Sequence, residues 1–308
     1  MDQSRFRAAA STMRFPLLVA AMTAAAICGS NVDLAGPLGL PRNANPNLVV
    51  FTTIVFFYSV VAGLERLHPY RREWNRPAGD VRTDLLHLII SGPGSNAVFE
   101  ITLRGIAASA AGWLSSQLGY TLWPGNWPVI AQLYFAIFVA EFGHYWFHRV
   151  SHEHPWAWRL HATHHSAPRL YWLNATRFHP LDLVALITCQ SVPLILLGIT
   201  PRAFLMYTLF AVVYGQLQHG NIALATRGFD WIFSTPTLHR WHHSPDVREG
   251  NANYGAILIT WDLLFRSFSR PADRVFDGRV GIDALPHFPT TYWAQLASPF
   301  RWRSFTSH

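Results

Sequence analysis

Residues 144–165 read HYWFHRVSHEHPWAWRLHATHH, with seven histidines in 22 residues. This stretch opens with the motif HxxxH at residues 144–148 and closes with HxxHH at residues 161–165; HxxHH occurs again at residues 239–243. Residues three and four apart share one face of a helix, so each motif is expected to present its imidazoles together. Twelve of the sixteen histidines lie between His144 and His243. The pattern predicts a metal site built on helices.

The predicted metal ligands are the histidines of the three motifs and two single histidines near the ends of a predicted helical hairpin. They are His144, His148, His161, His164, His165, His179, His219, His239, His242 and His243. Imidazole suits iron, zinc, copper and nickel, and clusters without thiolates exclude a structural zinc site of the cysteine type. Because ten histidines are more than one metal ion can bind, the sequence predicts two metal ions. The other histidines lack this spacing and are interpreted as ordinary residues: His68, His87, His152, His154, His287 and His308.

The composition indicates an integral membrane protein with substantial parts outside the lipid. Hydrophobic residues make up 50% of the 308 residues and charged residues only 13%, against about 25% charged in an ordinary soluble domain. This composition excludes disordered, collagen-like and disulfide-scaffold classes. Cys28 and Cys189 lie inside apolar runs without a metal-ligand spacing, and we interpret them as small hydrophobic residues. The net charge of +7 bears on membrane orientation, and no nucleic-acid partner is expected.

Apolar runs predict several membrane segments. Phe15–Cys28 follows an arginine-containing start and is expected to be a retained anchor, and Asn47–Leu64 is long enough to cross a ~30 Å hydrocarbon core. Leu85–Leu118 contains Gly92-Pro93-Gly94 and is expected to be broken or interfacial. The remaining predicted segments are Pro128–Tyr145 and a hairpin of Leu181–Ile199 and Ala203–Gln216, with Trp123 and Trp127 as an aromatic belt.

A basic loop sets the predicted orientation. Five arginines follow the second apolar run: Arg66, Arg71, Arg72, Arg76 and Arg82. The positive-inside rule places this loop on the cytoplasmic side. The predicted topology puts the histidine motifs on the same side.

The order HxxxH, HxxHH, HxxHH resembles the fatty acid hydroxylase / sterol desaturase superfamily of membrane di-iron oxygenases. The resemblance extends to RFHPLD at 177–182, QHGN at 218–221, HHSPD at 242–246, NYG at 253–255 and WDLLF at 261–265. It covers roughly Arg66–Phe268, about two thirds of the chain. The chain departs from the family where Phe265-Arg266-Ser267 stands in place of the usual Phe-Gly-Thr.

The resemblance implies an all-α fold, a polytopic membrane helical bundle with a cytosolic helical cap that holds a histidine-rich dimetal site. It implies two iron ions, O₂, and electrons from a separate ferredoxin- or cytochrome b5-like protein. The implied reaction is hydroxylation or desaturation of a lipid, such as a sterol or a fatty acyl chain, and the ten histidines match the family's ligands by position, His179 less closely than the others. The chain then divides into N-terminal membrane helices (1–65), a catalytic domain with transmembrane hairpins (66–268) and a C-terminal cytosolic tail (269–308).

Two further sets of residues are expected to serve such a site. Carboxylates and amides should orient the ring N–H groups that do not face metal; the candidates are Asp84, Glu141, Asn174, Asp182, Asn221, Asn253 and Asp262. The basic loop is a candidate docking surface for an acidic electron donor, since opposite charges steer association.

Two other kinds of protein remain open at this point. A zinc-dependent membrane hydrolase would need a helix of the HExxH type with glutamate as base, and the histidine pairs here enclose Tyr-Trp-Phe and Ala-Thr instead. A bis-histidine haem protein for electron transfer would need axial histidines paired across the bundle rather than three on one turn. Iron and haem assays separate these alternatives.

Overall fold

The regular structure of the protein is helical. The computed structural model describes residues 3–30, 46–271 and 275–306, and within them helices alternate with loops, apart from isolated β-bridges between Pro69 and Ile222 and between Phe233 and Leu258. The longer helices are α1 (Gln3–Gly29), α2 (Pro46–Leu67), α5 (Arg104–Leu118), α6 (Val129–Glu153), α7 (Pro155–His165), α8 (Pro180–Leu196) and α9 (Pro201–His219). The shorter α-helices are α3 (Val81–Leu86), α4 (Gly92–Val98), α10 (Pro236–His242), α11 (Val247–Gly250), α12 (Thr260–Leu264), α13 (Tyr292–Ala297) and α14 (Arg303–Thr306). These helices confirm the all-α prediction. His308 lies outside the described residues.

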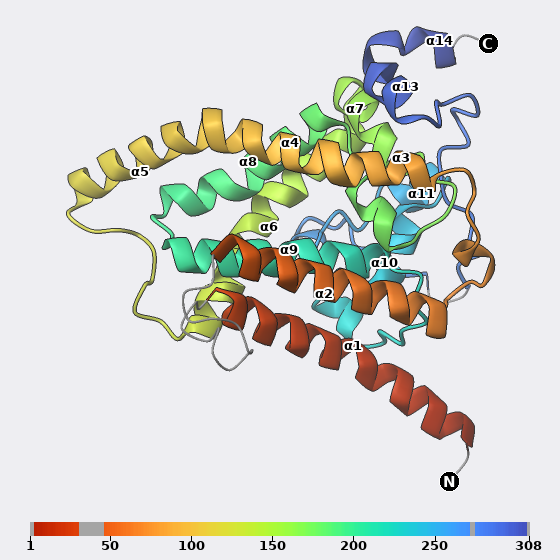
Figure 1. The fold of residues 1–308 in the computed structure, drawn as a ribbon, viewed down its shortest axis with the longest axis horizontal. Coiled ribbons are helices and arrows are strands. Elements are labelled where there is room, and N and C mark those ends of the chain that lie inside the picture. Colours follow the sequence, from red (N-terminus) through yellow and green to blue (C-terminus); the bar gives the residue numbers. More distant parts are fainter. Residues whose placement is uncertain (1–2, 31–45, 272–274, 307–308) are drawn as a thin grey trace.

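The long helices extend in similar directions, and the short helices that carry histidines gather toward one end (Figure 1). Helix α9 contacts α1, α2 and α6, and α10 contacts the end of α9. The end of α2 and the start of α3 lie toward the same end of the molecule as α10 and α11 (Figure 1). This arrangement places the basic loop that joins α2 to α3 near the histidine-bearing elements.

One helix in the described part of the chain is long and apolar enough to cross a membrane by length and composition. This segment is Val50–Leu67 within α2, which matches the predicted span Asn47–Leu64. The apolar parts of α1 (Arg14–Gly29) and α8 (Pro180–Leu196) are shorter. A single clear span is fewer than the sequence analysis expected.

Residues 81–118 form a continuous helical run instead of the broken segment that the sequence predicted. Two π-helical turns, His87–Ser91 and Phe99–Leu103, separate α3, α4 and α5. Pro93 lies in the first turn of α4, where a missing backbone N–H costs little. The glycines and the proline therefore change the helical hydrogen-bond pattern without ending the helix.

The predicted aromatic belt is also only partly present. Trp127 is exposed, but Trp123 is buried and its indole N–H donates to the side-chain oxygen of Gln132 at 3.0 Å. The amide nitrogen of Gln132 in turn donates to the carbonyls of Gly125 and Trp127. Trp123 thus fixes the turn before α6 rather than facing lipid.

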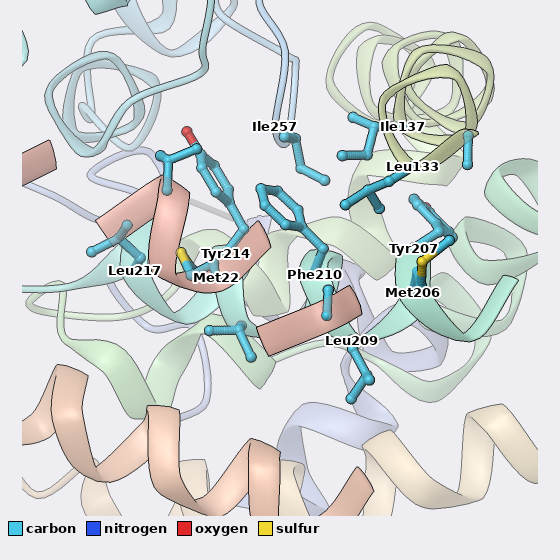
Figure 2. Close-up of a cluster of buried hydrophobic side chains, with 14 of the residues drawn as sticks. Met22, Leu133, Ile137, Met206, Tyr207, Leu209, Phe210, Tyr214, Leu217 and Ile257 are labelled. Carbon is cyan, nitrogen blue, oxygen red and sulfur yellow. The ribbon is translucent and has the colours of Figure 1, made fainter. Parts of the chain in front are cut away.

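The main hydrophobic core surrounds α9. Phe210 and Tyr214 of α9 pack with Met22 of α1, Ile137 of α6 and Ile257 of the loop before α12 (Figure 2). All of these side chains are buried. The core therefore joins the first helix, the histidine-bearing helix α6 and the loop that leads to α12.

Helices α6 and α8 approach most closely at Gly143. A Cβ at this position would lie 1.9 Å from the carbonyl oxygen of Cys189 and 2.7 Å from its carbonyl carbon. Only glycine permits this contact, because any side chain would overlap the backbone of α8. The neighbouring residue in the chain is His144, so the close contact sets where the first histidine motif lies.

Candidate metal centre

The first group of histidines brings together three helices. It consists of His148, His152, His161, His165 and His242, whose ligand atoms all lie within 4.8 Å of one another. Helix α6 does not end at Tyr145, where the predicted membrane segment ends, but continues to Glu153, and Pro155 then starts α7. The α6–α7 corner folds the two halves of residues 144–165 against each other, and α10 closes the group.

The second group lies beside the first. It consists of His164, His219, His239 and His243, again with ligand atoms within 4.8 Å of one another, and all four side chains are buried. The rings of His165 and His243, one from each group, stack at 4.3 Å between centroids. The two candidate metal positions are therefore adjacent, as a dimetal site requires.

Distances between ring nitrogens fit metal coordination. Two nitrogens bound to one ion at ~2.0–2.1 Å and ~90–110° apart are ~2.9–3.4 Å from each other. Nε2 of His242 lies 3.0 Å from Nε2 of His148, and Nε2 of His239 lies 2.9 Å from Nε2 of His219 and 3.0 Å from Nε2 of His243. Nε2 of His161 is buried without a hydrogen-bond partner among the described residues. The donor set therefore fits two metal ions.

Acceptors outside the groups orient the rings. In the first group, Nδ1–H of His148 donates to the carbonyl of Tyr254 at 2.7 Å, and that of His242 donates to the carbonyl of Ala252 at 2.8 Å. Nδ1–H of His161 donates to the carboxylate of Asp182 at 2.9 Å. Such bonds leave Nε2 unprotonated and directed inward, which is the form that binds metal.

The amide of Asn174 does the same in the second group. Its oxygen accepts from Nδ1 of His219 at 3.0 Å, and its nitrogen donates to the carbonyl of Arg169 at 2.5 Å. Asn174 and Asp182 are thus the two predicted orienting residues that contact ligand rings directly.

The other predicted orienting residues support the loops around the site. Asp262 accepts from the backbone N–H groups of Tyr254 and Gly255, both at 2.8 Å, and Glu141 accepts from those of Ala256 and Leu258. These two carboxylates fix the loop whose Tyr254 carbonyl orients His148.

Asp84, Asn221 and Asn253 act at other loops. Asp84 accepts a hydrogen bond from the side chain of Arg177 at 2.5 Å. The side-chain amide of Asn221 accepts from the backbone N–H of Arg71 and donates to its carbonyl. The side-chain amide of Asn253 makes the same pair of bonds with the backbone of Ser269. Asp84 thus binds a side chain, whereas Asn221 and Asn253 each hold a segment of backbone.

Burial keeps the ligand histidines neutral. Loss of hydration lowers the pKa of His242 to about 3 and lowers those of His165 and His243 well below the usual value near 6.5. Neighbouring imidazoles lower them further, because two cations would repel each other. These three rings are therefore neutral at pH 7, with one ring nitrogen free to bind metal.

Two of the ten predicted ligands lie outside both groups. The ring of His144 is 5.3 Å from that of His148, and its Nδ1 lies 2.9 Å from the amide nitrogen of Gln190. His179 begins α8: its Nδ1 accepts from the N–H of Leu181 and its Nε2–H donates to the carbonyl of Leu296 at 3.1 Å. With both ring nitrogens engaged, His179 caps a helix instead of joining a group.

The sequence analysis missed His152. It lies four residues after His148 on the same face of α6, and its Nε2 is 3.1 Å from Nε2 of His165. Its Nδ1 lies 3.2 Å from the side-chain oxygen of Asn251. The signal was present as HxxxHxxxH over residues 144–152, but it counts only if the helix extends past the expected membrane boundary at Tyr145.

The departure at residues 265–267 has a backbone explanation. Arg266 adopts a left-handed conformation with φ 60°, which glycine enters without strain and which costs other residues energy. The neighbouring Ser267 donates its hydroxyl to Asp262 at 2.7 Å, and its oxygen lies 2.9 Å from the hydroxyl of Tyr145. The turn is thus kept by other bonds although glycine is absent.

The segment 275–306 packs against the site rather than apart from it. The side-chain oxygen of Gln295 lies 2.9 Å from Nε2 of His87, and its nitrogen donates to the hydroxyl of Ser166, next to His165. The N–H of Gly281 donates to the carbonyl of His243 at 3.3 Å. The predicted C-terminal tail therefore contacts the chain on either side of the histidine groups.

Comparison with known proteins agrees with this geometry. The family model described as fatty acid hydroxylase matches residues 133–267, which contain both histidine groups. No solved structure matches the chain significantly.

Curated relatives are lipid-modifying enzymes. The chain is 36% identical to the ornithine lipid hydroxylase OlsE of Rhizobium tropici over 260 residues, 82% of this chain and 75% of that protein. It is 29% identical to human alkylglycerol monooxygenase (59% of this chain, 42% of that protein) and 30% identical to a Delta(7)-sterol 5(6)-desaturase of Aspergillus fumigatus (49% and 43%). The chain spans less than half the length of these two relatives. With a matching family model and a relative similar over most of both chains, this protein belongs to the fatty acid hydroxylase family of lipid hydroxylases and desaturases.

Proposed function

We propose that the protein is an integral-membrane hydroxylase that holds one iron ion in each histidine group and uses O₂ to oxidise a membrane lipid. The observation that carries this proposal is the pair of adjacent, buried, all-imidazole groups. Oxidation of an unactivated C–H bond requires activated O₂, which two irons would supply. Side chains that act only as acids or bases cannot supply it. His144 is a candidate additional ligand of the first group because its ring lies beside that of His148.

The protein's own residues provide orientation and exclude water. Asp182, Asn174 and the carbonyls of Ala252 and Tyr254 hold the rings in fixed directions. The ligand side chains of His161 and His242 are almost completely buried, at 2% and 0% exposure. A dry, rigid set of neutral ligands keeps both metal positions fixed while a substrate binds.

The geometry disfavours the two other kinds of protein. A bis-histidine haem would need room for its macrocycle between two ligand rings, whereas the ring nitrogens here are 2.9–3.1 Å apart. A zinc hydrolase needs a carboxylate base beside its metal, and neither histidine group includes an aspartate or glutamate among the described residues.

An ornithine lipid is the proposed first substrate. The relative that covers most of this chain is an ornithine lipid hydroxylase, and that relative and the alkylglycerol monooxygenase both add oxygen by name. We therefore expect a product heavier by one oxygen atom rather than one lacking two hydrogens.

The proposed topology is multi-pass, with the metal centre at the cytoplasmic side. Helix α2 would span fully, and α1, α8 and α9 would complete the bundle around it. The basic loop after α2 supports the orientation by the positive-inside rule. Its exposed residues Arg72 and Arg76 would also attract an acidic ferredoxin- or cytochrome b5-like donor.

Metal content and products test the catalytic proposal together. We expect about two irons per chain in purified protein, and an added oxygen in ornithine lipid when cells that make this lipid express the protein. Acid-extractable haem, or a single metal ion per chain, would contradict the dimetal assignment. Turnover with zinc in place of iron would contradict the redox assignment.

Salt dependence tests the donor proposal. Donor-driven turnover should fall as salt rises from ~50 to ~300 mM, because exposed charges are screened over ~8 Å at physiological ionic strength. The double variant Arg72→Gln, Arg76→Gln should lower the rate at low salt and lose this dependence, while Arg202→Gln should not. Unchanged donor-driven rates in the double variant would refute docking at this loop. Labelling of a cysteine at position 72 from the outer face only would refute the topology.

A further inference from the structure

Three arginines are buried in the described part of the chain, and one of them differs from the others. Arg169 pairs with Asp80 at 2.7 Å and Arg177 pairs with Asp84 at 2.5 Å. Arg240 is as deeply buried, at 3% exposure, yet no carboxylate in residues 3–30, 46–271 or 275–306 forms an ion pair with it. A buried charge without a counter-charge is costly, so this residue points to a missing anion.

The guanidinium of Arg240 is fixed on one side and open on the other. One terminal nitrogen donates to the carbonyls of Gly220 and Ile222, at 3.3 and 2.9 Å, and the group lies 3.9 Å above the ring of Tyr70. None of its nitrogens is among the fully buried atoms that lack a partner. The guanidinium nitrogens of Arg240 that form no hydrogen bond with the described residues are therefore accessible from a surface of the protein.

That surface is a cavity of about 460 Å³. Arg227 and Arg270 also line it, together with Tyr70, Trp241 and Phe276. Only Arg270 has a carboxylate partner among the described residues, Asp230 at 2.8 Å. The planar guanidinium group of an arginine can donate two parallel hydrogen bonds to the oxygens of a phosphate group. Several arginines in a concave cavity with aromatic walls therefore suit a phosphate group.

The cavity is separate from the metal centre and shares one lining residue with an apolar groove. On α10, Arg240 and Trp241 line the cavity, whereas His239 and His242 belong to the histidine groups. Leu224 lines both the cavity and a second one of about 250 Å³, whose walls include Leu17 and Leu18 of α1 and Leu64 of α2. Leu64 lies in the segment that is long enough to span a membrane.

We propose that this cavity binds the phosphate headgroup of an anionic membrane lipid, with an acyl chain along the groove between α1 and α2. The polar part of the site contacts arginines and the apolar part adjoins the proposed span, as a lipid at a membrane surface requires. The site is not the catalytic one, because no histidine of either group lines the cavity. Lipid binding there would neutralise Arg240 and hold α10 in place.

Binding of phosphatidylglycerol to the purified, metal-loaded protein tests this. Native mass spectrometry and thermal unfolding in mixed micelles should show tighter binding and a higher midpoint with phosphatidylglycerol than with phosphatidylcholine. Arg240→Gln should weaken phosphatidylglycerol binding about tenfold, the loss expected for one charge-assisted contact. Arg227→Gln, at an exposed position, should weaken it less without disturbing the fold. Arg202→Gln, at an exposed position in the first turn of α9, is the matched control and should bind normally, and iron content confirms that each variant is folded.

The possible outcomes separate the alternatives. Equal binding of the two lipids by the unaltered protein, or normal phosphatidylglycerol binding by Arg227→Gln together with Arg240→Gln, would overturn the proposal. Inorganic phosphate that raises the midpoint as much as the lipid, and competes with it, would identify a soluble ligand and overturn the lipid assignment. Because binding and unfolding are measured without turnover, the result stands apart from the proposed hydroxylase activity.

Discussion

The two halves of helix α6 are held in place by different physics. The first half, which includes Leu133 and Ile137, lies in the apolar core and meets α8 by close contact at Gly143. The second half carries His148 and His152, whose rings are oriented by hydrogen bonds from loops more than ninety residues away in sequence. Apolar packing is not directional, so the first half is sensitive to volume, whereas the second is sensitive to the direction of single bonds.

The largest expected effect comes from removing a metal ligand of the site to which the second half of α6 contributes. His242→Ala should abolish turnover and lower iron content, since it removes a ring that contacts His148 at 3.0 Å. Lipid products and iron per chain are the measurements. His154→Ala, at an exposed histidine outside both groups, is the control and should retain both. Normal turnover in His242→Ala would refute the ligand assignment.

Adding a methyl group tests the packed half. Gly143→Ala should destabilise the protein by about 3 kcal/mol or more, because its Cβ would overlap the Cys189 carbonyl and force α6 and α8 apart. The thermal midpoint in detergent measures this. Gly112→Ala in α5 has open space around it and should stabilise the helix by about 0.5–1 kcal/mol. Equal midpoints for the two variants would show that the close contact is not formed.

A change at one orienting bond should affect metal binding more than folding. Asp182→Asn removes the charge that faces Nδ1 of His161, and it should weaken iron binding about 10–100-fold. Iron titration of the metal-free protein measures the affinity, and the thermal midpoint checks the fold. Asp283→Asn, at an exposed ion pair with Arg279, should leave affinity unchanged. If both variants bind iron like the original protein, Asp182 does not orient His161.

The smallest effect is expected at the turn after α12. Arg266→Gly relieves a left-handed backbone conformation, but glycine also gains freedom in the unfolded chain. The two terms oppose each other, so the change in unfolding free energy should stay within about 1 kcal/mol. A larger loss of stability would mean that the Arg266 side chain holds the turn.

Prediction from sequence succeeded where spacing along one helix was enough. The motifs at residues 161–165 and 239–243 each place three histidines on neighbouring positions of a helix, and every one of these six histidines belongs to one or the other histidine group. Prediction failed at His152, which was judged to lack the ligand spacing, although it follows His148 by four residues on α6 and lies in the first group. The assignment of His179 came from its position in a family motif, and its place at the first turn of α8 uses both ring nitrogens.

Sequence alone was enough to predict the helical class, the membrane-length helix α2, the histidine motifs and the family, because periodicity and spacing act within one element. Only the tertiary structure decided how the histidines divide between two groups, since His242 joins α6 and α7 while His239 and His243, on the same turn, join α9. It also showed that Arg240 has no carboxylate partner among the described residues, whereas Arg169 and Arg177 do. These facts depend on distances between segments far apart in the chain, which packing sets and local pattern does not contain.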